Sequence, residues 1–281
     1  MATRKKPAKV NTDEWHFRLS AIRHNPDDPG AVPDLARALE SKSNFVIAKA
    51  AQIVETRQEL SLQPALIAAF HRLFEDPSGR DPSCTGLTAL ATTLHSFDCA
   101  DTLLFLKGIR HVQMEGSFGP SVDAAVELRA ISAIALAQHR DPRVVFELTI
   151  LLADKEPGAR MGAARALGCC GSVAAFPLLH FKTLAGDADL NVITECYASM
   201  IALDAARTVA ILEETIREGG DHAEPAALAL GPSRHARAFE ILKANYESLV
   251  RGPLKQALLI AISLCRTEEA QAYVDPLRHK L

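Results

Sequence analysis

A short Ala-rich segment recurs along the chain at intervals of 30 to 33 residues. Residues 159–168 read ARMGAARALG and residues 222–231 read HAEPAALALG, so AARALG returns as AALALG two intervals later. An earlier copy at 128–137 reads LRAISAIALA, and a weaker copy at 192–201 reads VITECYASMI. Such a period is typical of helical repeats, in which stacked neighbours bury apolar surface that no single repeat buries alone. We therefore expect a stack of helices.

Each Ala-rich copy follows an apolar segment with helical spacing and a short acidic turn. Residues 142–153 read PRVVFELTILLA and lead into the turn DKEPG, while 173–184 and 205–217 lead into AGDAD and EGGD. The repeating unit is thus predicted to be a pair of helices. Further helices are expected near 13–24, 30–41, 44–58, 62–75, 84–95, 98–110, 234–250, 253–265 and 268–280, which gives about fourteen helices and no strand.

Two connections are longer than a helical repeat needs. Residues 76–85 read DPSGRDPSCT, and residues 110–121 read RHVQMEGSFGPS. Both follow the first helix of a pair, so both are expected at the same edge of the array, where solenoids usually place specificity. Tolerated surface insertion is an equal alternative for each loop.

Composition and charge narrow the class of protein. Hydrophobic residues make up 48% of the 281 residues and charged residues 23%, as in soluble globular proteins. The net charge of -3 excludes a globally basic protein. Residues 1–12, which carry four Lys and Arg, are predicted to be a disordered basic tail, with an arm for nucleic acid or a membrane surface as the alternative. Residues 13–281 are predicted to form a single solenoid.

The sequence also bears on compartment and cofactors. No run of about 18 apolar residues occurs, so no membrane span is predicted. The six cysteines form no C-x-x-C pair and show no metal-ligand spacing, so we expect a reduced, cytoplasmic protein without a metal or cofactor.

The pattern Asp/Glu-x-x-(apolar)-Arg-x-x-Ala-Ala-x-Ala-Leu-Gly resembles the HEAT-like repeat of the phycobilisome-lyase type. Residues 156–168 carry it best, and the resemblance is sharp from about 122 to 232. It implies an all-α, right-handed α-α superhelix of about seven helical hairpins. In such repeats the Arg braces the Asp-bearing turn of a neighbouring repeat, which the resemblance implies for Arg129 and Arg160; ligand binding is the alternative for both.

The chain lacks the residues that enzymes with similar repeats need. Deoxyhypusine hydroxylases need His-Glu pairs as iron ligands, and none of the ten histidines here is followed by Glu. HEAT-like DNA glycosylases use an aromatic cage, for which this chain offers only three Tyr, with Trp15 outside the repeats. Nucleotide-binding and α/β-hydrolase signatures are absent as well. We therefore assign no catalytic residue and expect a non-catalytic protein.

The exposed side of the Ala-rich helices is predicted to be the binding surface. In solenoids of this kind these helices line the concave face, where Met161 and Arg165 lie one helical turn apart. By register, the other candidate contact residues are Ile131, Thr194, Glu224 and Leu228. A groove for phosphates would carry Arg or Lys at most of these positions, whereas this mixed strip suits a helix or extended segment of a protein partner.

These observations favour a protein-binding scaffold or adaptor that uses its concave face and the two long loops. The first alternative is a protein that contacts the nucleic-acid backbone and is related to HEAT-like DNA glycosylases. The second alternative is an accessory subunit of a bilin-lyase-type enzyme. Steep salt dependence of binding would favour the first, and a coloured bilin adduct would favour the second.

Overall fold

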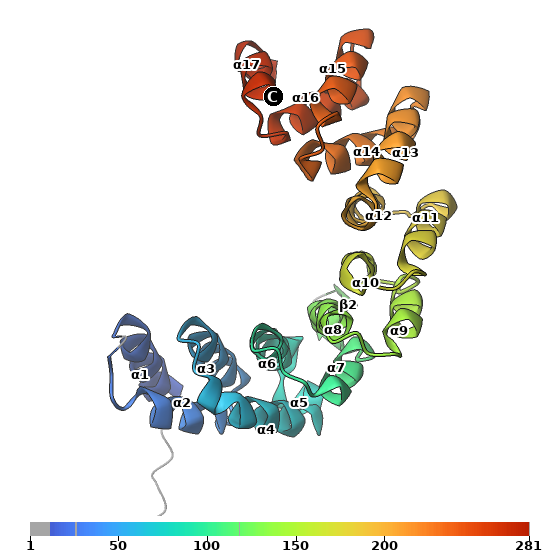
Figure 1. Ribbon diagram of the computed structural model, residues 1–281. Helices are drawn as coiled ribbons and strands as arrows, with labels where there is room; N and C mark the ends of the chain where they lie inside the picture. Colours follow the sequence, from blue (N-terminus) through green and yellow to red (C-terminus); the bar gives the residue numbers. More distant parts are fainter. Residues whose placement is uncertain (1–11, 26, 118, 281) are drawn as a thin grey trace, which may run out of the picture. The chain divides into compact units, whose positions relative to one another are not determined.

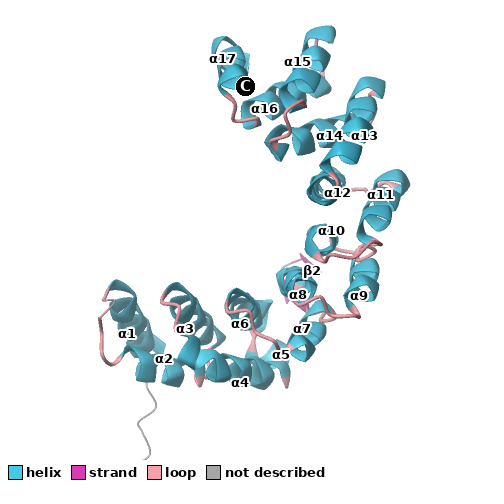
Figure 2. Cartoon of the chain, in the orientation of Figure 1, coloured by secondary structure: helices cyan, strands magenta, loops and turns pink. Residues whose placement is uncertain are grey.

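The computed structural model describes residues 12–25, 27–117 and 119–280. It confirms the all-α fold, because the described part contains seventeen α-helices and one short two-stranded hairpin (Figure 2). The predicted basic tail lies outside the described residues, except that Thr12 already begins the first helix. No helix in the described ranges has the length and apolar character needed to cross a membrane. The chain divides into two compact units, residues 1–135 and 136–281, and the boundary falls within the last turn of α8.

The first unit contains two rows of helices (Figure 1). Its α-helices are α1 (Thr12–His24), α2 (Ala31–Leu39), α3 (Asn44–Thr56), α4 (Gln63–Phe74), α5 (Pro77–Arg80), α6 (Thr85–Ser96), α7 (Thr102–Ile109) and α8 (Val126–Gln138). Helix α3 packs between α1 and α6 in one row, and α2 packs against α4 in the other. Helix α7 packs against α8 so closely that a methyl group on Gly108 would overlap the Ser132 hydroxyl.

The second unit repeats one arrangement four times. Its α-helices are α9 (Val144–Leu151), α10 (Pro157–Cys169), α11 (Ala175–Ala185), α12 (Leu190–Leu203), α13 (Ala205–Glu218), α14 (Ala223–Leu230), α15 (Ala238–Ser248), α16 (Pro253–Leu264) and α17 (Glu268–Val274). The Ala-rich helices α10, α12 and α14 and then α16 pack side by side in that order, and α9, α11, α13 and α15 each pack against the helix that follows (Figure 1).

Small residues make this close stacking of the Ala-rich helices feasible. Ala163, Ala166 and Ala227 are fully buried between neighbours. A methyl group on Gly231, which directly follows α14, would overlap the Ala261 carbonyl oxygen of α16. Ala and Gly in these helices therefore set how near one repeat lies to the next.

Local sequence signals explain where several helices begin and end. The carboxylates of Asp189 and Asp204 accept hydrogen bonds from backbone amides in the first turns of α12 and α13. The helix expected at 98–110 begins only at Thr102, because Asp98 is in the left-handed region (φ 52°) and Asp101 caps the helix. The helix expected at 268–280 ends at Val274 and continues as a 3₁₀-helix.

The expectation of no strand was wrong for the second long loop. Strands β1 (Met114–Ser117) and β2 (Gly119–Asp123) form an antiparallel hairpin in which Met114 pairs with Asp123 (Figure 2). The segment lacks a helical apolar period, and the Asp123 carboxylate accepts a hydrogen bond from the Gln113 backbone amide at 3.1 Å, which holds the two ends together. The first long loop also gains order as α5 and the 3₁₀-helix Pro82–Cys84. A single right-handed superhelix over residues 13–281 remains a prediction.

Candidate functional site

Arg160 joins two successive acidic turns of the second unit. Its Nε and Nη2 atoms lie 2.7 and 2.6 Å from the two carboxylate oxygens of Asp187, and Lys182 Nζ lies 2.8 Å from the same group. Its Nη1 atom donates to the carbonyl oxygens of Asp154 and Lys155. Burial alone would raise the pKa of Asp187, but the hydrogen bonds from Arg160 and Lys182 lower it to about 2. Arg160 is thus engaged inside the repeat stack.

Arg129 is enclosed within the first unit, where its side chain is only 2% exposed. Its Nη1 atom lies 2.8 Å from Asp123 Oδ2 and donates to the His111 carbonyl oxygen at 2.8 Å. The same aspartate accepts the backbone amide of Ala125. Arg129 therefore ties α8 to the β-hairpin that precedes it.

The two long loops contact each other in the first unit. The Gln113 side-chain amide donates to the Asp81 carbonyl oxygen at 2.9 Å, and the Ser83 backbone amide donates to Glu115 Oε1 at 2.7 Å. The Asp81 carboxylate, which is completely buried, accepts hydrogen bonds from Asn44 and from two backbone amides at the start of α6. This polar network accounts for much of the conformation of both loops, and it leaves the Asp81 carboxylate with no exposed surface.

The predicted binding residues lie on the Ala-rich helices. Helices α10, α12 and α14, which pack side by side, carry Met161 and Arg165, Thr194, and Glu224 and Leu228, respectively. Ile131 lies on α8 within the first unit.

Two of these side chains already have partners within the second unit. Arg165, with 55% of its side chain exposed, forms two hydrogen bonds with Glu195 at 2.5 and 3.2 Å and thereby links α10 to α12. The Thr194 hydroxyl donates to the Leu190 carbonyl oxygen in its own helix. The predicted face is therefore a mixed surface, whose polar side chains make contacts within the unit and whose apolar members, Ile131, Met161 and Leu228, are half-buried.

Exposed apolar side chains lie on the opposite row of helices, where sequence reasoning did not place a binding surface. Phe146 and Ile150 on α9 and Phe181 and Leu184 on α11 are between 56% and 73% exposed. These four residues are called the apolar patch below. The signal was present in the sequence: α9 reads VVFELTIL, which is apolar around most of its circumference. When one side of such a helix packs on α10, another side must face solvent.

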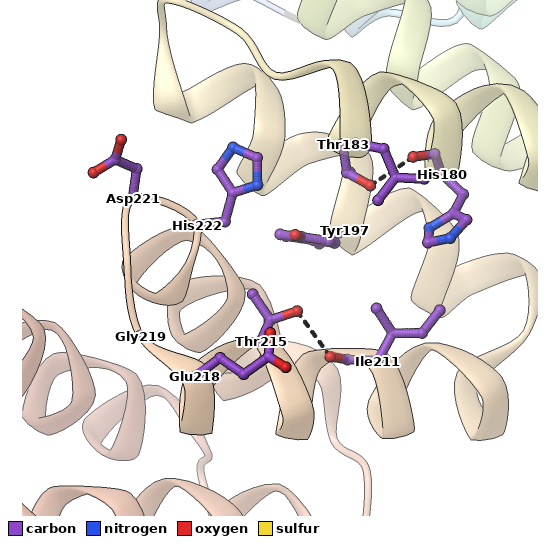
Figure 3. Close-up of a pocket in the computed structure, with 10 residues that line it drawn as sticks. His180, Thr183, Tyr197, Ile211, Thr215, Glu218, Gly219, Asp221 and His222 are labelled. Carbon is purple, nitrogen blue, oxygen red and sulfur yellow. Dashed lines mark hydrogen bonds between the residues drawn. The ribbon is translucent and has the colours of Figure 1, made fainter.

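A pocket of about 410 Å³ lies next to this patch in the second unit (Figure 3). Figure 3 shows Tyr197 near the centre, with Asp221 and His222 on one side and His180 on the other. Helices α11, α12 and α13 and the turn before α14 contribute the lining residues His180, Thr183, Leu184, Tyr197, Ile211, Thr215, Glu218, Gly219, Asp221 and His222.

The pocket has a mixed lining, in which a few apolar side chains stand beside Thr and His side chains and two carboxylates. Tyr197 is only 3% exposed, and burial raises the pKa of its phenol, so the ring stays neutral. Glu218 and Asp221 are exposed carboxylates, and in the described part of the chain neither forms an ion pair. No Lys or Arg is among the residues that line the pocket. Such a pocket favours a cationic group.

Within the described ranges, no three His, Cys, Asp or Glu side chains are grouped so that they could hold a metal ion.

The fold places this chain among all-α proteins built from successive pairs of helices. No protein-family model matches the sequence, and no curated protein matches it. Among solved structures, human deoxyhypusine hydroxylase in complex with glycerol is similar over 93% of this chain and 91% of that chain. The two share 16% identical residues, and the TM-score is 0.33, a value too low to establish a common fold.

Proposed function

We propose that the chain is a non-catalytic, HEAT-like scaffold that binds a protein partner in the cytoplasm. The apolar patch carries this proposal. Four large apolar side chains on α9 and α11 face solvent, and exposed apolar surface on a folded domain is typical of protein-binding sites. The six free cysteines, five of which are buried, support a reducing compartment.

The geometry of the patch suits a helix or an extended segment. Phe146 and Ile150 lie four residues apart on α9, and Phe181 and Leu184 lie three apart on α11, so each pair projects from one side of its helix. Helices α9 and α11 are anchored on α10 and α12, which keeps the side chains in place. A partner that buries them gains about 25 cal/mol for each Å² of apolar surface removed from water.

The face of the Ala-rich helices is proposed as a second contact surface. Met161 and Leu228 supply apolar contacts, while the Arg165–Glu195 pair and Glu224 supply polar ones. The two faces belong to opposite rows of helices, so substitutions on each face separate their roles.

The test is affinity purification from a nuclease-treated native extract with four forms of the full chain. These are the wild type, a patch variant (Phe181→Asp with Leu184→Asp), a face variant (Met161→Asp with Arg165→Glu) and a control. The control, Leu103→Asp with Val250→Asp, also places two acids on exposed apolar residues, but on α7 and in the turn after α15, which carry none of the patch or face residues.

We expect the wild type and the control to retain a discrete protein that the patch variant loses. Loss with the face variant as well would add the second contact surface. Equal retention by all four forms, or retention only of material that the nuclease removes, would contradict a protein-binding role for these surfaces. Circular dichroism of each variant checks that the helices remain intact.

A further inference from the structure

The acidic residues along the turns of the second unit fall into two groups. Asp187 binds Arg160 and Lys182, and Asp189 caps α12 by accepting the Asn191 backbone amide at 2.9 Å. These carboxylates are used by the fold itself.

Glu218 and Asp221 differ because both are exposed, line the pocket of Figure 3 and lack an ion-pair partner among the described residues. The nearest cation along α13, Arg217, pairs with Glu214 instead. Two negative charges at one pocket, with no Lys or Arg in its lining, give a local potential that attracts a positive group.

The walls of the pocket specify what kind of cation fits. Leu184 and Ile211 present apolar surface beside the largely buried ring of Tyr197, which suits the methylene stem of a long basic side chain. The carboxylates of Glu218 and Asp221 at the rim are complementary to the charged head, which favours Lys or Arg. The volume of about 410 Å³ leaves room for such a side chain.

The position of the pocket links it to the apolar patch, because Leu184 belongs to both. A segment that inserts a basic side chain here brings its neighbouring residues over Leu184 and Phe181. Apolar residues beside the basic one would then cover the exposed surface of α11.

We infer that the pocket formed by α11, α12, α13 and the turn before α14 binds a Lys or Arg side chain from an apolar-flanked segment of the protein partner. This inference rests on the proposed function and adds the chemistry of the partner. Charge complementarity selects the occupant, because two carboxylates without an ion-pair partner among the described residues line a cavity that has no Lys or Arg in its lining.

Phage-displayed random peptides, panned against the immobilised full chain, test this inference. The same panning is done with a pocket variant (Glu218→Gln with Asp221→Asn), a single Phe181→Asp variant that leaves the pocket lining unchanged, and a control (Glu268→Gln with Glu269→Gln). The control also removes two negative charges, but from exposed positions at the start of α17. Enriched peptides are then synthesised with a fluorescent label, and their affinities are measured by anisotropy.

We expect the wild type and the control to enrich peptides with a basic residue beside apolar ones. The pocket variant should bind these peptides at least about tenfold more weakly, as for loss of a charge pair at an interface. Replacing the basic residue of the peptide by Gln should have the same effect on the wild type. Spermidine, a small cation without apolar flanks, should not displace the peptide at equal concentration.

The outcomes separate this inference from the proposed function. Enriched apolar peptides that lack a basic residue, and that bind the pocket variant as well as the wild type, would overturn the inference while the protein-binding role stands. Equal weakening by the control variant would show a general charge effect and would also overturn it. If no peptide is enriched by the wild type, both ideas fail.

Discussion

Replacing Asp187 by Asn tests how the acidic turns stabilise the repeat stack. The Asp187 side chain is 2% exposed, and it accepts hydrogen bonds from Arg160 and Lys182. One pKa unit corresponds to about 1.4 kcal/mol, so a pKa held at about 2 instead of 3.8 contributes about 2 kcal/mol at neutral pH. Asn keeps the shape of the side chain but removes the charge.

The contacts that Arg160 and Lys182 keep in the variant decide whether the loss of stability exceeds about 2 kcal/mol. Breaking a buried ion pair typically costs about 3–5 kcal/mol because a charge is left unpaired. Here Arg160 keeps its hydrogen bonds to the carbonyl oxygens of Asp154 and Lys155, and Lys182, with 18% of its side chain exposed, reaches water. We therefore expect Asp187→Asn to lower the free energy of unfolding by about 2–3 kcal/mol at pH 7.

The pH dependence of the stability difference tests whether the charge of Asp187 is responsible. A carboxylate with a lowered pKa in the folded state stabilises the protein fully above its unfolded pKa, and this stabilisation is lost as the pH falls from about 4 towards 2. The difference between wild type and Asp187→Asn should thus shrink to about half at pH 3. Urea unfolding followed by circular dichroism at both pH values measures it, with Asp221→Asn as the exposed control.

Two results would refute this account. One is a difference in stability that is the same at pH 7 and pH 3, since the loss would then not depend on the charge of Asp187. The other is an Asp221→Asn variant that is destabilised as much as Asp187→Asn, since Asp221 is exposed and forms no ion pair among the described residues.

Three further predictions concern packing, a buried carboxylate and thiol reactivity. Gly231→Ala should lower the free energy of unfolding by about 1–3 kcal/mol, because its methyl group overlaps the backbone of α16. Gly116→Ala, which has open space around it, should leave the free energy unchanged within error, and urea unfolding measures both. Asp81→Ala should lower the free energy of unfolding by about 3 kcal/mol, because it removes the acceptor of three buried hydrogen bonds. Asp76→Ala removes only an exposed helix cap and should cost about 1 kcal/mol, and thermal unfolding of both variants measures the difference. In the native chain, a thiol reagent at pH 8 should modify Cys169 first because the other five cysteines are buried, and Cys169→Ser should abolish that fast phase in an absorbance assay.

Sequence periodicity was sufficient to predict the helices and the all-α class, because an amphipathic or Ala-rich helix is encoded within its own dozen residues. Most expected helices, such as those near 44–58 and 253–265, agree with the structure to within two residues. The repeat pattern also singled out Arg160, whose partner Asp187 lies one turn further along the stack.

The tertiary structure decided which surfaces are available. The hairpin around Glu115 depends on hydrogen bonds with residues from the other long loop, and no local pattern encodes them. The apolar patch could not be predicted from the sequence, because a helix such as α9 that is apolar on most sides does not indicate which side its neighbours will cover. The pocket beside Tyr197 forms only where four segments meet. That Glu218 and Asp221 line a common pocket therefore depends on packing and cannot be predicted from their spacing in the chain.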